Sequence, residues 1–105
     1  MKAEQDLLEK VKASISETEP TATLILFGSY ARGDYNQNSD LDLLILVDQE
    51  KITMTDRKRI TYPLYDIEFD TGILISPMVY SKEDWESRKG KTPFHENVSR
   101  EGRVL

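Results

Sequence analysis

Two aspartates separated by one residue, Asp40 and Asp42, are the pair in this chain best suited to chemistry. They open an apolar run that ends at Val47 and predicts a strand, although aspartate itself is a poor strand former. Alternation along a strand places both carboxylates on one face, roughly 6.5 Å apart along the backbone. Carboxylates held so close repel each other, and one or two divalent cations would relieve that repulsion. Taken alone, the pair fits a solvated strand start, with Asp40 capping a turn, equally well.

A glycine–serine turn, Gly28-Ser29, lies ten residues before the aspartate pair. It follows the apolar, β-branched run Thr21–Phe27, which predicts a strand covered on both faces. Glycine permits either a positive φ or the close approach of a ligand to the backbone. The N–H groups of a short helix over Ser29–Arg32, together with the serine hydroxyl, would suit an anion. An ordinary strand-to-helix corner explains the turn alone, but the turn and the aspartates together favour a metal and phosphate site.

The spacing of these two elements resembles the signature of the polymerase-beta-like nucleotidyltransferase superfamily. In this chain the signature reads Phe27-Gly28-Ser29, ten residues, and then Asp40-Leu41-Asp42-Leu43. The segments from Gly28 to Gly33 and from Ser39 to Asp42 resemble the minimal, single-domain nucleotidyltransferases of prokaryotes in particular. The resemblance is strong over residues 22–48 and holds elsewhere only in outline.

The resemblance implies a function for each of these residues. Gly28 and Ser29 would hold a nucleoside triphosphate such as ATP, and Asp40 and Asp42 would be the catalytic ligands of Mg²⁺. The expected reaction transfers a nucleoside monophosphate to an acceptor hydroxyl. Arg32 lies on the same helix face as Ser29. It would either contact phosphate or pair with an acid such as Asp34.

One departure from the superfamily pattern concerns a third carboxylate, which normally comes from the next strand. In this chain the corresponding position is Ser76. Asp66, Glu68 and Asp70 alternate with apolar residues as on a strand edge, so one of them is a candidate replacement. Without a third acid, we expect an alternative function: a catalytically weak or inactive antitoxin or interaction module that acts with a separate, toxin-like helical protein.

The elements that must position these residues indicate an α/β (α+β) fold, with a small mixed β-sheet and flanking helices. Strands are expected near residues 21–27, 41–48 and 73–80. Pro77 cannot donate a hydrogen bond, so the last strand is expected at an edge of the sheet or to contain a bulge.

Four helical regions are expected around this sheet. Residues 2–19 form an amphipathic pattern, in which Leu8, Val11 and Ile15 follow helical spacing. Within residues 51–72, Ile60, Leu64 and Ile67 recur at helical spacing while Pro63 interrupts the pattern. The resemblance favours a helix here, with a kink or break near Tyr62-Pro63. Ser81 and Asp84 indicate a helix start. A last short helix is expected from Phe94 to Glu101, ended by Gly102.

Composition narrows the class of protein. The 105 residues indicate one domain over residues 1–105, without an appended helical domain. The chain has no cysteine, which excludes disulfides and thiolate zinc sites. The net charge of −5 argues against non-specific binding of nucleic acid. No apolar run has the length of a signal peptide or a membrane span, so we expect a cytoplasmic protein, with self-association into a homo-oligomer left open.

Three further features have structural explanations in the sequence. The basic run Arg57-Lys58-Arg59 is expected to be a solvated helix face, with a phosphate contact as the alternative. Trp85 is expected to anchor the core. His95 is the sole histidine, and without a paired nucleophile it is expected to pack or to lie at the surface.

Overall fold

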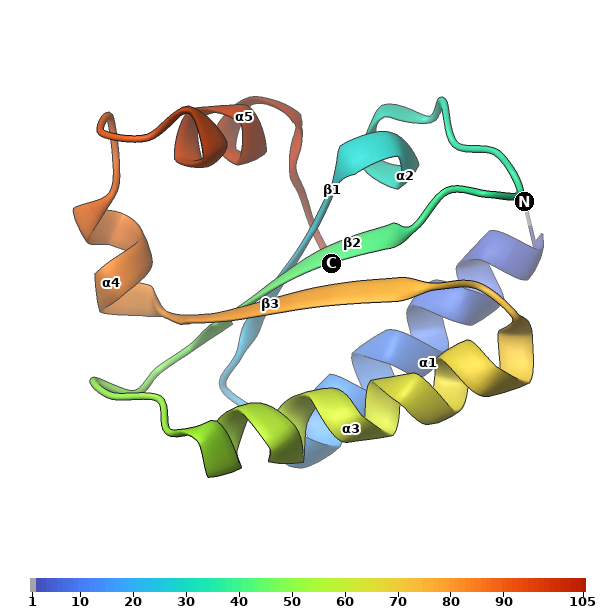
Figure 1. The fold of residues 1–105 in the computed structure, drawn as a ribbon, viewed down its shortest axis with the longest axis horizontal. Helices are drawn as coiled ribbons and strands as arrows, with labels where there is room; N and C mark the ends of the chain where they lie inside the picture. Colours follow the sequence, from blue (N-terminus) through green and yellow to red (C-terminus); the bar gives the residue numbers. More distant parts are fainter. Residues whose placement is uncertain (1) are drawn as a thin grey trace.

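The computed structural model describes residues 2–105 and contains one four-stranded sheet in the order β3-β2-β1-β4 (Figure 1). These strands are β1 (Thr23–Phe27), β2 (Leu41–Val47), β3 (Ile75–Ser81) and β4 (Arg103–Val104). β1 runs antiparallel to both β2 and β4, whereas β2 and β3 are parallel. The mixed sheet and its first three strands confirm the prediction, and β4 is an addition that the sequence did not predict.

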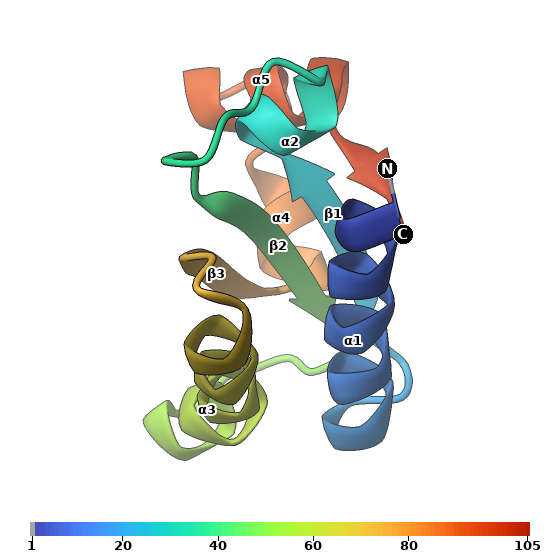
Figure 2. The ribbon, with the colours of Figure 1, turned by 90° about the vertical axis from the view of Figure 1, so that its right-hand side faces the viewer.

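The helices cover both faces of this sheet. α1 (Lys2–Thr18) and α3 (Met54–Thr71) pack against each other on one face (Figure 2). α2 (Gly28–Arg32) and α5 (Pro93–Glu101) lie on the other side of the sheet from α1 and α3, and α4 (Lys82–Ser87) follows the end of β3. Two separate apolar clusters therefore hold the fold together.

Alternation along β2 divides its side chains between these clusters. The odd-numbered residues from Leu41 to Val47 are buried beneath α1 and α3. Leu44 and Leu46 instead pack with Trp85 and Val98, which come from α4 and α5. β1 is also covered on both faces, because Leu24 and Leu26 join the first cluster while Ile25 and Phe27 pack against the second. This confirms the prediction for the first strand.

In α1, the buried side chains are Leu7, Val11 and Ile15, which recur every four residues. Leu8 is only partly buried at the edge of the same cluster. The helix and its apolar face were thus predicted, with the centre of the face displaced by about one position.

The prediction of a break in α3 is wrong, because the helix runs without interruption through Pro63. Proline costs the helix one backbone hydrogen bond, but Ile60 and Leu64 are fully buried on either side of it and hold both halves against the core. The strand-like alternation of Asp66, Glu68 and Asp70 is likewise part of this helix and not of a sheet edge. Tertiary packing therefore overrides both local signals.

The C-terminal half agrees with the sequence. β3 pairs only with β2, so Pro77 lies on an edge strand as predicted. The Ser81 hydroxyl accepts a hydrogen bond from the Asp84 N–H (2.9 Å) at the start of α4. Trp85 is buried and stacks against His95, whose ring is also buried, at 4.4 Å between ring centroids. Among residues 2–105, no helix is both long and apolar enough to cross a membrane.

Candidate active site

The two predicted aspartates lie at the head of β2, on the face of the sheet toward α5. Asp42 has the same parity as Leu44 and Leu46, whose side chains pack with α5. Asp40 lies just before the strand and shares that parity. In the antiparallel pairing of β1 with β2, Asp42 lies opposite Phe27, the residue directly before the glycine turn. The sheet register therefore brings Asp42 to Gly28, as the prediction of a single site requires.

Gly28 is in contact with the carboxylate of Asp42. Its φ is +72°, a left-handed backbone conformation that residues with a side chain rarely adopt. A Cβ atom at this position would lie only 2.2 Å from Oδ2 of Asp42. Gly28 thus has both the positive φ and the close approach to its backbone that the sequence suggested. The group that approaches it is the carboxylate of an aspartate of the same chain.

The surroundings of Asp42 disfavour its charged form. Burial is the main cause that raises the pKa of Asp42 above its ordinary value, followed by the nearby charge of Asp40. Glu101 acts in the same direction, and the positive charge of Arg32 opposes both. A half-buried carboxylate under this repulsion is one that a cation would stabilise.

Ser76 occupies the position from which a third acid would complete the site. It lies opposite Asp42 in the parallel pairing of β2 with β3. Its hydroxyl donates a hydrogen bond to Oδ2 of Asp40 (3.3 Å). The predicted alignment at Ser76 is therefore consistent with the geometry, and the side chain there is a neutral donor.

None of the three acids proposed as replacements for this residue forms a metal cluster with the aspartates. Asp66, Glu68 and Asp70 belong to α3, and Glu68 accepts a hydrogen bond from the N–H of Ile75 (3.0 Å). Within residues 2–105, no three or more His, Asp or Glu side chains are arranged so that they could hold a metal ion. The predicted metal ligands are thus the two carboxylates of Asp40 and Asp42, at the head of β2.

Arg32 pairs with acids, which is the structural alternative considered for it. Its Nε donates to Asp34 (3.2 Å), and its Nη1 lies 3.3 Å from both carboxylate oxygens of Glu101. The backbone carbonyl of Ser29 accepts hydrogen bonds from the N–H groups of Gly33 and Asp34 and so closes the turn. The Ser29 hydroxyl has no hydrogen-bond partner among the described residues, which leaves it available to a ligand.

Glu101 is a site residue that sequence reasoning missed. Its Oε1 accepts a hydrogen bond from the N–H of Gly28 (3.3 Å). The helix that carries it was predicted, but the two residues lie 73 positions apart. No local pattern could reveal this contact, because it depends on how α5 packs across the sheet. The Gly28 N–H, in the turn expected to hold a phosphate, thus meets a carboxylate of the same chain.

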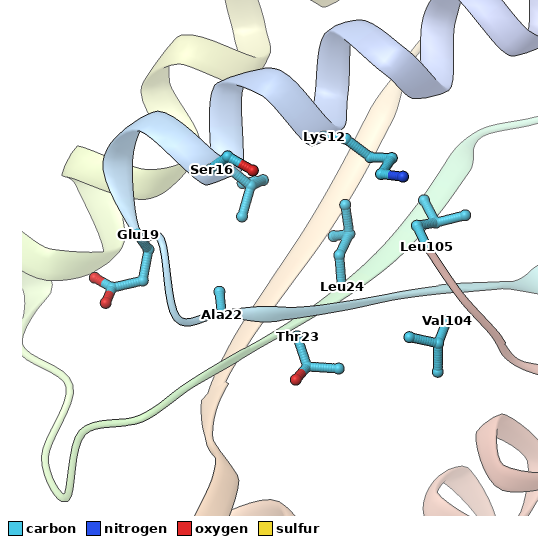
Figure 3. A pocket seen from close by; sticks show the side chains of 9 residues that line it. Lys12, Ser16, Glu19, Ala22, Thr23, Leu24, Val104 and Leu105 are labelled. Carbon is cyan, nitrogen blue, oxygen red and sulfur yellow. The ribbon is translucent and has the colours of Figure 1, made fainter.

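The hollow drawn in Figure 3 is a different part of the surface. It has a volume of about 190 Å³ and lies between α1, the start of β1 and the residues of β4 and after. Its polar lining includes Lys12, Ser16 and Glu19, and it contains none of the predicted site residues. Without paired carboxylates or a glycine turn, this hollow lacks the chemistry of the site at β2.

The profile of the nucleotidyltransferase domain matches residues 8–94. The chain belongs to this family. Two proteins of Methanocaldococcus jannaschii, both provisionally named protein adenylyltransferases, are similar to this nucleotidyltransferase domain. One is 41% identical over 81 residues, which cover 73% of this chain and 79% of the relative. The other is 40% identical over 85 residues, with 78% and 75% covered.

Solved structures agree with the family. A structure provisionally described as a minimal nucleotidyltransferase has a TM-score of 0.63 and 27% identity, and covers 96% of this chain and 94% of its own. A toxin–antitoxin crystal structure with AMP-PNP has a TM-score of 0.65 and covers 91% of this chain and 69% of its own. At 20% identity, the second likeness concerns the fold alone. The α/β fold of minimal nucleotidyltransferases is thereby confirmed.

The donor set of this nucleotidyltransferase domain fits a hard divalent cation. Mg²⁺ is commonly held by one or two carboxylates, with substrate phosphates and water as the remaining ligands. Asp40 and Asp42 supply two carboxylates on one side of β2, and the half-buried Asp42 is under repulsion that a cation would offset. Members of the family typically use a divalent metal.

Proposed function

We propose that this protein is a Mg²⁺-dependent nucleotidyltransferase that transfers the adenylyl group of ATP to a hydroxyl group of a protein. Membership of the family supports the reaction class. The provisional names of two relatives, at 41% and 40% identity, support ATP as donor and protein as acceptor. The observation that carries the proposal is the close approach of the Asp42 carboxylate to Gly28, in the turn that also carries Ser29.

In this proposal each residue of the chain has a defined task. Asp40 and Asp42 hold Mg²⁺, which when bound neutralises charge on the phosphates. The turn at Gly28 and the hydroxyl of Ser29 position the triphosphate. The acceptor hydroxyl loses its proton to solvent water as its oxygen bonds to the α-phosphorus, the bond from that phosphorus to the bridging oxygen breaks, and pyrophosphate leaves. Positioning and electrostatic stabilisation supply most of the rate in such transfers.

The test is label transfer from ATP in the presence of Mg²⁺ and a host lysate. ATP labelled at the α-phosphorus should yield a labelled protein only when this protein is added, whereas label from the γ-phosphorus should not increase when it is added. Asp42→Asn should reduce transfer by about a hundredfold or more, since charge stabilisation of the phosphates is lost. Asp48→Asn is the matched control, because Asp48 follows the other end of β2 and is exposed. Equal transfer by both variants would refute the proposed site.

A second function has an observation of its own in its favour. Ser76 stands where the third carboxylate would be, so the proton of the acceptor hydroxyl has no acid on β3 to receive it. The alternative is therefore an antitoxin or interaction module that binds a separate helical protein and transfers nucleotides weakly or not at all. The fold similarity to a structure from a toxin–antitoxin complex is compatible with it.

The two functions differ in what the aspartates contribute. An interaction module should bind its partner protein with unchanged affinity after Asp40→Ala and Asp42→Ala, and no label should pass from any nucleoside triphosphate. Calorimetry should then detect no Mg²⁺-dependent binding of ATP. An active transferase should instead bind ATP in the presence of Mg²⁺ and lose this binding in Asp42→Asn.

A further inference from the structure

Helix α3 carries a row of exposed aromatic side chains on the side that faces away from the core. Tyr62, Tyr65 and Phe69 are spaced by three and four residues and so share one helix face. Phe69 is 89% exposed, Tyr62 56% and Tyr65 44%. The fully buried Ile60 and Leu64 lie on the opposite side of the helix. We call these three residues the aromatic row.

Exposed apolar surface is concentrated at this helix. Among the described residues, six large hydrophobic side chains are exposed, and five of them lie on α3 or just after it. Besides the aromatic row these are Met54, at the first turn of α3, and Leu74, just beyond its end. Single exposed apolar residues are ordinary, but a continuous row of this kind marks an interaction surface.

Charged residues of opposite sign flank the two ends of the row. Lys58 precedes Tyr62 by four residues, and Asp66 and Asp70 lie beside Tyr65 and Phe69. Lys58, Asp66 and Asp70 are exposed and make no ion pair with another described residue. The two residues next to Lys58 in the sequence, Arg57 and Arg59, do form contacts within the chain.

Those neighbours bind within the chain. Arg57 donates to the carbonyl of Val79 (2.7 Å), and Arg59 pairs with Glu19 (3.1 Å). All three residues of the basic run are exposed, as expected for a solvated face, but Lys58 alone of the three makes no such contact with another described residue.

We propose that α3 is the surface through which two copies of this chain pair, with their α3 helices antiparallel about a two-fold axis near Tyr62 and Tyr65. An isologous interface must be complementary to itself. Antiparallel pairing meets this condition, because Lys58 of each copy then lies near Asp66 and Asp70 of the other. Parallel pairing would place like charges side by side. A row that is apolar in its middle and of opposite charge at its ends fits a second copy without any further partner.

The proposed pairing leaves the candidate active site free. α3 covers the face of the sheet with the odd-numbered residues of β2, whereas Asp42 belongs to the other face. Figure 2 shows α3 at the bottom and α2 at the top of the view, with the sheet between them. The inference therefore stands independently of the proposed function.

Sedimentation equilibrium of the full chain over a range of concentrations tests the proposal. The wild-type mass should rise from monomer to dimer as concentration increases. Phe69→Ser should raise the dimer dissociation constant by about tenfold or more, because the most exposed aromatic side chain of the row is removed from the interface. The proposal would be overturned if the wild-type protein stays monomeric at every concentration. This includes the case in which the aromatic row binds only a different protein.

Charge variants test the direction of pairing. Lys58→Glu should weaken an antiparallel dimer, since it places a carboxylate beside Asp66 and Asp70, but should leave a parallel dimer unchanged. Combining Lys58→Glu with Asp66→Lys and Asp70→Lys should restore the dimer. Lys89→Glu is the control, because Lys89 is exposed and lies in the turn after α4. Thermal melts should show that each variant folds. A dimer that is insensitive to Lys58→Glu would overturn the antiparallel arrangement.

Discussion

At the scale of single residues, Ser76 determines how many carboxylates face the proposed metal. Ser76 lies opposite Asp42, and its hydroxyl donates a hydrogen bond to Asp40. A carboxylate introduced at this position would therefore lie beside the carboxylates of Asp40 and Asp42. We expect Ser76→Asp to bind Mg²⁺ more tightly and to transfer nucleotide about tenfold faster or more, because a third carboxylate can also accept the hydroxyl proton. Metal titration by calorimetry and label transfer measure the two effects. Ser76→Asn has the same size without the charge, and an equal gain in that variant would contradict the explanation.

Asp42 should cost the protein stability when no cation is bound. Because its pKa is raised in the fold, chiefly by burial, the folded protein holds this proton more tightly than the unfolded chain does. Stability should therefore fall as the pH rises through the window above the ordinary value of 3.8. We expect Asp42→Asn to melt at a higher temperature than the parent at neutral pH without divalent ions. The difference should shrink in acid, and a lower melting temperature at neutral pH would contradict this prediction.

The contact between Gly28 and Asp42 can be isolated from backbone strain. Gly28 and Gly90 have almost the same φ, +72° and +73°, but a Cβ at Gly90 would meet nothing within 4 Å. Gly90→Ala should therefore show only the strain of a left-handed residue, about 1–3 kcal/mol. Gly28→Ala should lose more stability and should also displace the carboxylate of Asp42. Chemical denaturation of both variants measures the difference in unfolding free energy. Equal losses of unfolding free energy would show that the Asp42 side chain can move away without destabilising the protein.

At the scale of elements, α3 depends on its first turn. Thr53 and Asp56 form a reciprocal capping box, in which the Thr53 side chain accepts from the Asp56 N–H (3.1 Å) and Asp56 accepts from the Thr53 N–H (3.0 Å). Thr53→Ala should cost about 1 kcal/mol of unfolding free energy. Thr55→Ala is the control, because Thr55 lies two residues after Thr53 in the same helical turn and is exposed. Urea denaturation at neutral pH measures both, and equal effects would exclude the cap as the cause.

The same cap should respond to pH. The backbone hydrogen bond from Thr53 is the main cause that lowers the pKa of Asp56 below its ordinary value. Its stabilising contribution is therefore complete above the ordinary value of 3.8 and is lost as the pH falls through the lowered pKa. The cost of Asp56→Asn should accordingly be seen at neutral pH and should disappear in strong acid.

Local sequence predicted those elements whose patterns agree with their packing. The strands at Thr21–Phe27 and Asp40–Val47 and the turn between them carry both periodicity and spacing, and they came close to the structure. The helix of α3 was predicted, but the expected break was wrong, because the unfavourable Pro63 is offset by the burial of Ile60 and Leu64, which is a property of the folded molecule. β4 is too short to carry any pattern.

At the scale of the whole molecule, the site joins parts of the chain that are far apart in sequence. Asp42 could be predicted because the spacing to Gly28 lies within one β-strand pair. Glu101 could not, since only the packing of α5 beside α2 brings it to the Gly28 N–H and to Arg32. The local half of the candidate site could thus be predicted from the sequence, whereas the half that depends on tertiary structure could not.

This long-range link should affect nucleotide binding. Glu101 accepts the Gly28 N–H and its charge disfavours ionised Asp42, so it competes with any phosphate at the turn. We expect Glu101→Gln to bind ATP with Mg²⁺ about tenfold more tightly, because one negative charge leaves the site. Calorimetry measures the affinity. Glu96→Gln, at an exposed position of the same helix, is the control. Weaker binding by Glu101→Gln would instead make Glu101 a residue that supports the site.

The outer edge of β3 closes the sheet to further growth. Pro77 has no N–H to offer on this edge strand, and Arg57 already occupies the carbonyl of Val79. A strand from another polypeptide would find one donor missing and one acceptor taken within three consecutive residues. The sheet should therefore resist the edge-to-edge association that leads other small β-containing proteins into fibrils.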